Sequence, residues 1–417
     1  MPTHSAKIQF GLAFKVIFMA RFSYSYVPVL LLASCITGGA AACYTAIFGF
    51  GDSLTDAGNL IHLQTGGKVP HMYFSPYGET FFGHPTGRCS DGRLILDFIA
   101  QHYGLDIPPP SLQKLKDIKT SDPNNNNNIN NNNNNNNNNT GMNFAVVGSR
   151  AVDAQFYERR GIYDTVTNVS MTDQLDWFLL NTLSSLCNSP SSECKRVMEE
   201  SLFVLGEFGG NDYTHALLSG KNVNDITPFI PIVAQTIANG VHRLVEAGAM
   251  TVMVPGVLPL GCAASYLTYY PSPKEEDYDE NGCLIWVNEM ASYHNHLLQE
   301  QLNRLRDRHP HARIVYADLF HAAMQIYADP AASGFSEGAL TACCGGGGPY
   351  NFNPGVQCGD EGATFCENPS MYVNWDGYHL TETAYSVITN ALLDGPFTYP
   401  PMNALCRYPA HNLLAQL

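Results

Sequence analysis

The chain has 417 residues, a formal net charge of −15 at neutral pH and twelve cysteines. The acidic balance argues against nucleic acids and anionic membrane surfaces as partners, and it would repel a polyanionic substrate. The length suits one large α/β domain or two small ones.

The segment 1–42 is typical of a secretory signal peptide. Basic residues precede an apolar run at 26–36, and the small residues Ala40–Ala42 suit signal peptidase. The apolar run is shorter than the roughly 20 residues that a spanning helix needs, and no later segment is long and apolar enough to span a membrane. We therefore expect a secreted protein whose mature part spans 43–417, without stable membrane insertion.

A buried strand is predicted at Ala46–Phe50, and it stops abruptly at Gly51-Asp52-Ser53. A serine at the mouth of a strand, beside a glycine that permits a tight turn, is placed where a nucleophile belongs. The motif is not the G-x-S-x-G elbow of ordinary α/β-hydrolases, because Leu54 and Thr55 follow. Gly, Asp and Ser are also the commonest turn residues, so these three positions alone do not decide between a turn and a nucleophile.

The segment 66–93 is rich in Gly, Pro and aromatic residues, which argues against regular structure. This loop is a candidate binding rim, and for any single residue a plain surface loop is an equal alternative. The Asn-rich stretch 122–139 cannot bury apolar surface, so we expect a disordered insertion. Two Asn-x-Ser/Thr sequons make Asn138 and Asn168 candidate glycosylation sites.

Hydrophobic periodicity predicts alternating helices and strands along the rest of the chain. Helices are expected at 94–103, 172–187, 226–246, 284–308, 319–328 and 382–393. Strands are expected at 142–147, 201–206, 250–254 and 313–317. This alternation favours a parallel sheet that is covered by helices on both faces. Thr172 is the expected cap of the second helix.

The cysteine set fits an oxidising compartment. Cys35 would leave with the signal peptide and Cys43 lies at the cleavage edge, so ten cysteines remain for the mature chain. The even number favours disulfides, and Cys343-Cys344 lacks the C-x-x-C spacing of a metal site. Two local pairs are expected, each closing a loop: Cys187–Cys194 and Cys262–Cys283.

Asp376 and His379 lie three residues apart, just ahead of the last helix. A serine hydroxyl is a poor nucleophile at neutral pH, so it needs a base, and the base needs a partner that fixes its tautomer. On a turn, this spacing lets one short segment direct both side chains toward Ser53. We assign Ser53 as nucleophile, His379 as general base and then acid, and Asp376 as the orienting carboxylate.

Motifs along the chain resemble those of the plant GDSL esterase/lipase family, within the SGNH hydrolases. Phe50–Asn59 matches the opening motif F-G-D-S-L-x-D-x-G-N, and 76–93 is similar to P-x-G-x-x-F-x-x-x-x-x-G-R-x-S-D-G-R. The segment 343–351 is similar to C-C-G-G-G-G-x-Y-N. The resemblance covers nearly all of the mature chain, and the Asn-rich insertion is its one gross departure.

The resemblance implies one hydrolase domain at 43–417, a flavodoxin-like α/β/α sandwich around a central parallel sheet. It implies a secreted, extracellular or cell-wall esterase or lipase that cleaves carboxylic esters through an acyl-enzyme on Ser53, as in lipid degradation. The Ser53 amide, the Gly148 amide and the Asn211 side chain would form the oxyanion hole. No cofactor or metal is expected, and the partner is a small-molecule or cell-wall ester acted on by a monomer.

Two other functions stay open at this point. Some relatives of this kind carry fucosidase labels, although no motif here positions the second carboxylate that a glycosidase needs. The other alternative is a non-catalytic cell-wall binding glycoprotein, against which the intact set of site residues argues. The ester also stays open, because aromatic residues at 72–82 and 266–270 suit an acyl chain, a phenolic ester or an acetylated sugar equally well.

Overall fold

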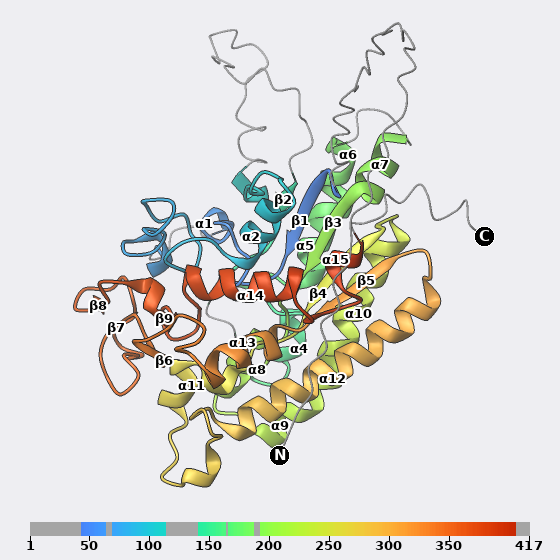
Figure 1. The fold of residues 1–417 in the computed structure, drawn as a ribbon. Coiled ribbons are helices and arrows are strands. Elements are labelled where there is room, and N and C mark those ends of the chain that lie inside the picture. Colours follow the sequence, from blue (N-terminus) through green and yellow to red (C-terminus); the bar gives the residue numbers. More distant parts are fainter. Residues whose placement is uncertain (1–42, 64–68, 114–140, 164–165, 187–191, 406–417) are drawn as a thin grey trace, which may run out of the picture. The chain divides into compact units, whose positions relative to one another are not determined.

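A six-stranded sheet in the order β10-β5-β4-β3-β1-β2 organises the fold (Figure 1). Neighbouring strands pair in parallel from β5 to β2, and the edge strand β10 pairs antiparallel with β5. The predicted α/β class is confirmed. The strands are β1 (Ala46–Phe50), β2 (Met142–Asn143), β3 (Ser201–Leu205), β4 (Thr251–Pro255), β5 (Arg313–Ala317) and β10 (Thr398–Tyr399).

The computed structural model describes residues 43–63, 69–113, 141–163, 166–186 and 192–405. All of them belong to one compact unit, Ala42–Leu417. The predicted signal peptide, the 122–139 insertion, Asn138 and Cys187 lie outside the described residues. The domain boundaries that rest on them stay predictions.

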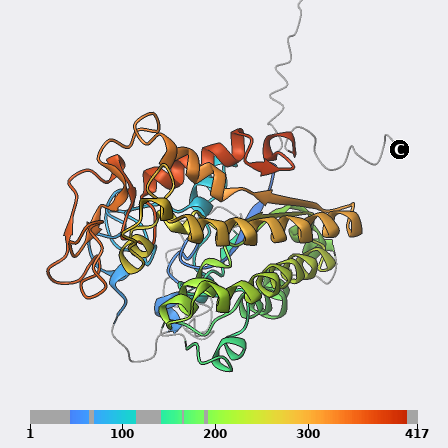
Figure 2. The same cartoon turned by 90° about the horizontal axis from the view of Figure 1, so that it is seen from below.

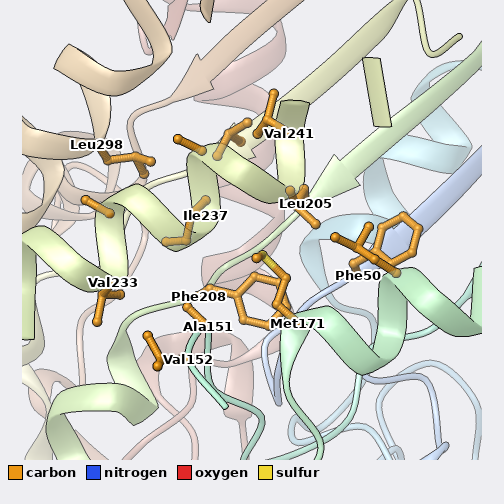
Figure 3. Close-up of a cluster of buried hydrophobic side chains, with 14 of the residues drawn as sticks. Phe50, Ala151, Val152, Met171, Leu205, Phe208, Val233, Ile237, Val241 and Leu298 are labelled. Carbon is orange, nitrogen blue, oxygen red and sulfur yellow. The ribbon is translucent and has the colours of Figure 1, made fainter. Parts of the chain in front are cut away.

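Alternate side chains of the strands enter two separate cores, because successive residues of a strand point to opposite faces. Phe203 and Leu205 pack with helices α5, α8, α10 and α12, whereas Leu202 and Val204 pack with α2, α13 and α14. Figure 3 shows part of the first core, where Phe50 and Leu205 of the sheet lie near Ile237 of α10. These helices are α2 (Ile95–His102), α5 (Met171–Asp176), α8 (Gly210–Leu218), α10 (Ile230–Glu246), α12 (Ile285–Arg308), α13 (Leu319–Ala328) and α14 (Glu382–Asp394).

Helices therefore cover both faces of the sheet, as the alternating sequence pattern predicts. On one face, α10 and α12 pack against each other and lie side by side in Figure 2. The shorter helices are α1 (Leu60–Leu63), α4 (Ala154–Glu158), α6 (Leu183–Leu186), α7 (Ser192–Glu200), α9 (Val223–Ile226), α11 (Ala264–Tyr269) and α15 (Met402–Leu405).

The helix predicted at 172–187 begins one residue earlier and is capped differently. Ser170, not Thr172, is the N-cap: its side chain accepts from the Asp173 N–H, and the Asp173 carboxylate accepts from the Ser170 N–H. This reciprocal pair is a capping box, which satisfies two backbone donors at once. After α5 the chain continues as a π-helical segment, Trp177–Thr182, before α6.

A cross-linked segment follows α13 and stands apart from the main sheet. It holds the parallel pair β6 (Gly338–Ala342) and β9 (Tyr372–Asn374) and the antiparallel pair β7 (Cys344–Gly345) and β8 (Thr364–Phe365). Two disulfides link its parts, Cys343–Cys366 and Cys344–Cys358. The Gly-rich run is thus part of a disulfide-stapled loop.

The cysteine predictions are partly confirmed. Cys262–Cys283 forms as predicted. Cys43, set aside at the cleavage edge, is disulfide-bonded, and so is Cys194, whose predicted partner is outside the described residues. Cys89 is a free, fully buried thiol. The prediction that the even set of ten cysteines forms disulfides was therefore wrong for this residue.

Candidate active site

The turn that carries Ser53 leaves the end of β1, in the interior of the sheet. Asp52 O accepts from the N–H groups of Thr55 and Asp56, at 3.1 and 2.8 Å, which closes the turn. Gln174 of α5 holds the turn from the side: its side chain accepts from the Gly51 N–H at 2.9 Å and donates to the Gly51 carbonyl at 2.8 Å. Both backbone groups are buried, so this side chain satisfies polar groups that water cannot reach.

The loop that carries Asp376 and His379 connects β9 to α14. Trp375 N–H donates to the His379 carbonyl at 2.7 Å, and Asp376 Oδ1 accepts from the His379 N–H at 3.0 Å. Gly377 adopts φ +100°, and a side chain there would collide with Phe352. A tight turn therefore puts the two functional side chains on one side of the loop, as their spacing predicts.

The structure brings Ser53, His379 and Asp376 into one hydrogen-bonded line. His379 Nε2 lies 2.8 Å from Ser53 Oγ, and His379 Nδ1 lies 2.8 and 2.9 Å from the two Asp376 oxygens. All three residues are buried, with at most 9% of their surface exposed. Such a line can carry a proton from the serine to the imidazole while the carboxylate holds the ring.

The predicted oxyanion-hole residues also lie at this end of the sheet. Gly148 follows β2 in a turn with φ +81°, and a Cβ there would come within 2.9 Å of Val166. Within the described residues, the N–H groups of Ser53 and Gly148 have no hydrogen-bond partner, and both residues line the same cavity. These two donors are thus available to a bound anion.

Asn211, the second residue of α8, is already engaged. Its side-chain nitrogen donates to Asp52 Oδ2 at 2.7 Å and to the Ser149 carbonyl at 3.1 Å. Both amide hydrogens therefore have acceptors, although Asn211 lines the cavity beside Ser53 and Gly148.

A cavity of about 450 Å³ opens above these groups. Its size falls within the roughly 300–1,000 Å³ of small-molecule sites. Aliphatic side chains and five aromatic ones line it. The aromatic residues are Tyr77, Tyr266, Tyr269, Phe352 and Tyr378.

Comparison with known proteins decides the class of the molecule. The family described as GDSL-like Lipase/Acylhydrolase matches residues 47–392. A GDSL esterase/lipase of Arabidopsis thaliana is 44% identical over 364 residues, which cover 87% of this chain and 85% of the relative. The chain belongs to the GDSL lipase/acylhydrolase family.

Further relatives agree with this GDSL assignment. A second Arabidopsis thaliana GDSL esterase/lipase is 41% identical over 87% of both chains. The sinapine esterase of Brassica napus is 41% identical over 87% of this chain and 88% of its own length. The protein is accordingly a hydrolase that acts on ester bonds, and this class is favoured over the glycosidase and non-catalytic alternatives.

The buried carboxyl groups of this GDSL site differ in the direction in which their pKa values are shifted. Burial would raise the pKa of Asp376, but His379 and the Tyr77 hydroxyl lower the pKa to about 2. Burial lowers the pKa of His379, yet the Asp376 carboxylate outweighs it and holds this pKa well above the ordinary value. Burial raises the pKa of Asp52 to about 7, and burial together with Asp52 raises the pKa of Glu207 well above its usual range.

Sequence reasoning missed three residues of the GDSL site. Tyr77, fully buried, donates to Asp376 Oδ2 at 2.7 Å. Gln174 holds the Gly51 backbone, and Glu207 lines the cavity, with one oxygen accepting from the Gly210 N–H at 2.9 Å. Tyr77 and Asp376 are 299 residues apart, and no local sequence pattern indicates a contact over such a separation.

The predicted rim at 66–93 is confirmed in part. Among its described residues, Pro70, His71, Met72 and Tyr77 line the cavity. Arg88 instead forms a buried ion pair with Asp97 at 2.7 Å, so much of this segment supports the fold. Asn168 is exposed, as a glycosylation site requires. None of the helices within the described ranges is long and apolar enough to cross a bilayer.

Proposed function

We propose that this GDSL hydrolase is a secreted serine esterase that works through an acyl-enzyme on Ser53. His379 Nε2 takes the Ser53 proton as the hydroxyl attacks the ester carbonyl, and then gives a proton to the departing alcohol. A water activated by His379 releases the acid from Ser53. Asp376 fixes the imidazole and stabilises its cation. The observation that supports this proposal most directly is the 2.8 Å distance between His379 Nε2 and Ser53 Oγ.

The oxyanion would accept hydrogen bonds from the N–H groups of Ser53 and Gly148, which have no other partner among the described residues. Asn211 would supply a third donor by exchanging its longer contact, the 3.1 Å bond to Ser149 O, for the oxyanion. Keeping the 2.7 Å bond to Asp52 holds the amide in place meanwhile. Each such donor is worth on the order of 10²–10³ in kcat.

Replacing Ser53 tests the proposal most directly. We expect Ser53→Ala to lower kcat for p-nitrophenyl acetate by about 10⁴- to 10⁶-fold, because the nucleophile is lost while binding groups remain. A serine-reactive fluorophosphonate should label wild-type protein at Ser53, as identified by peptide mass spectrometry. Substantial turnover by the folded variant would refute the assignment.

Ser149→Ala is the matched control. Ser149 is equally buried in the same region, but its hydroxyl has no hydrogen-bond partner in the described structure. Its backbone carbonyl, which Asn211 contacts, is retained in the variant. We expect this variant to keep wild-type kcat and labelling, which separates loss of the nucleophile from disturbance of the site.

The natural ester is best sought among small esters with an apolar or aromatic part. The cavity volume and its aromatic lining support this choice, and one relative is named a sinapine esterase. Sinapine is therefore the first natural ester to test, beside short-chain, long-chain, phenolic and acetyl-sugar esters. Uniform kcat/KM across this panel would contradict a selective cavity.

Secretion has its own test. Expression of the full chain in plant cells should yield extracellular protein whose new N-terminus lies near Ala40–Ala42. Treatment with a peptide N-glycosidase should lower its mass if Asn168 is glycosylated, and Asn168→Gln should remove that site's share of the mass shift. Intracellular retention of an uncleaved chain would overturn the localisation.

A further inference from the structure

Three side chains of types that bind metal ions gather where α10 and α12 end, away from the esterase site. His242 and Glu246 lie one turn apart on α10, and His309 directly follows α12. They are the one group of three or more candidate ligand residues among the described residues, and their ligand atoms all lie within 4.8 Å of one another.

The cluster sits at the opposite edge of the sheet from Ser53. The α10 helix runs into the start of β4, and His309 precedes the start of β5, whereas Ser53 and Asn211 follow the ends of β1 and β3. Because these strands are parallel, their starts and ends define two different edges. A ligand here would not touch the reacting groups.

The Glu246 carboxylate stands apart from both rings, a little farther than two ligands of one ion. Glu246 Oε1 lies 3.9 Å from His242 Nδ1 and 3.8 Å from His309 Nδ1, too far for a hydrogen bond to either ring. Tetrahedral ligands bound at about 2.0–2.2 Å stand roughly 3.3–3.6 Å apart, so Glu246 would have to move slightly closer. The two rings are joined through the other nitrogen of His309, because His242 Nδ1 lies 2.9 Å from His309 Nε2. This hydrogen bond would have to break for the Nδ1 atoms of both rings to bind the same ion.

Two imidazoles and one carboxylate are a ligand set that suits zinc. His309 is nearly buried and fixed at the end of α12, where its N–H donates to the Leu305 carbonyl at 2.8 Å, so one ligand is preorganised. Glu246 is well exposed, which gives an ion access from solvent. His311, exposed and with its ring centre 5.8 Å from that of His309, is within reach as a fourth ligand in place of water.

We propose that His242, Glu246 and His309 form a zinc site that clamps the end of α10 to the end of α12. The ion would act on stability and not on catalysis, because it binds the folded helices together and binds the unfolded chain less well. This inference does not depend on the assignment of Ser53.

Zinc titration of the purified mature protein, after treatment with EDTA and desalting, tests the site. Calorimetry should show about one equivalent of Zn²⁺ bound. The melting temperature should rise by about 3–5 °C at a 100-fold excess of zinc over its Kd. Hydrolysis of p-nitrophenyl acetate at 25 °C should be the same with and without that equivalent, whereas Mg²⁺ should shift neither signal.

Variants identify the ligands. Glu246→Gln and His242→Gln change exposed or half-buried side chains, so both should fold, and each should abolish the zinc-dependent rise in melting temperature. His296→Gln is the matched control, because His296 and Glu300 form the same i,i+4 pair on α12, at 3.3 Å, without a buried third ligand. It should bind zinc like the wild type.

Two results would overturn the site. One is an apo protein that takes up no stoichiometric zinc, which would leave the cluster as a hydrogen-bonded pair of histidines. The other is zinc binding that survives both Glu246→Gln and His242→Gln, or that inhibits the esterase in step with binding, because the ion would then occupy other ligands.

Discussion

The two segments that meet at the site are held in different ways. The Ser53 turn continues an inner strand of the main sheet and is fixed by Gln174 from a packed helix. The loop with Asp376 and His379 leaves β9, which pairs with β6 outside that sheet. Cys343 N–H and Cys344 N–H donate to the Asn374 and Trp375 carbonyls at 2.9 and 2.7 Å, so the two disulfides hold this loop at its base.

The two proposed catalytic side chains are therefore positioned by different kinds of contact. The sheet and its buried core position Ser53, the proposed nucleophile, whereas cross-links and a few hydrogen bonds position His379, the proposed base. Damage to the cross-linked segment should therefore displace His379 while leaving Ser53 in position, and damage to the sheet side should do the reverse.

Among the variants that test this comparison, the largest effect is expected when His379 loses its carboxylate partner. Asp376→Asn should lower kcat by about 10⁴-fold, because the amide offers His379 Nδ1 an N–H and favours the wrong tautomer. The folded loop should survive, since the remaining oxygen still accepts from the Tyr378 and His379 N–H groups. Steady-state kinetics with circular dichroism checks both parts, and a variant within tenfold of wild type would contradict the role.

Opening one disulfide should be the next most damaging change. Cys344→Ser with Cys358→Ser removes a link between residues 14 apart, worth about 2–4 kcal/mol of stability. A displaced base should lower kcat by about 10- to 100-fold in protein that is still folded.

The matched control opens a disulfide outside the cross-linked segment. Cys262→Ser with Cys283→Ser removes a link between residues 21 apart and should cost similar stability. It should lower kcat less than the first double variant, because both disulfides beside the base loop stay closed, although the Ser265 N–H donates to the Gly377 carbonyl at 3.0 Å. Equal losses of kcat in the two double variants would show that the cross-links act only through global stability.

On the sheet side, Gln174→Met should destabilise the protein by roughly 1–3 kcal/mol, the cost of one buried donor without a partner. The Gly51 N–H would lose its acceptor, whereas the Gly51 carbonyl would still accept from the Val146 N–H at 3.1 Å. Urea unfolding monitored by fluorescence measures the loss. Gln235→Met, on the exposed face of α10, should change stability little and serves as the control. A similarly small effect at Gln174 would mean that the Ser53 turn is stable without the Gln174 side chain.

The smallest change is expected from Tyr77→Phe, which removes one hydrogen bond to Asp376. A bond to a charged group is worth about 1.5 kcal/mol or more, so kcat should fall roughly tenfold. The general base must be neutral, so kcat rises with pH through the pKa of His379, which Asp376 already raises. Without Tyr77 the carboxylate attracts the imidazolium more strongly, so the rise in kcat should move to higher pH.

A pH–rate profile measures both effects in Tyr77→Phe. Tyr163→Phe is the control, since Tyr163 is 68% exposed. A shift of the profile to lower pH, or an unchanged kcat, would show that the hydroxyl does not act on Asp376.

The strands and the motif residues could be predicted from the sequence, whereas residues that act through tertiary contacts could not. Strands such as Arg313–Ala317 were predicted to the residue, because buried parallel strands are short apolar runs between clear stops. Ser53 and His379 were singled out by local motifs, and the structure brings them together. Tyr77 and Gln174 were missed because their roles depend on tertiary contacts. The short edge strand β10 was missed because two residues carry no periodic signal.

The cap of α5 bears on how the Asn168 sequon should be removed. Ser170 is both the third residue of that sequon and the group that starts the helix carrying Gln174. Replacing Ser170 would destroy the sequon and loosen the helix that holds the Ser53 turn, so any change in rate would be wrongly credited to the missing sugar. The sugar's own contribution can be isolated at Asn168, whose side chain is exposed.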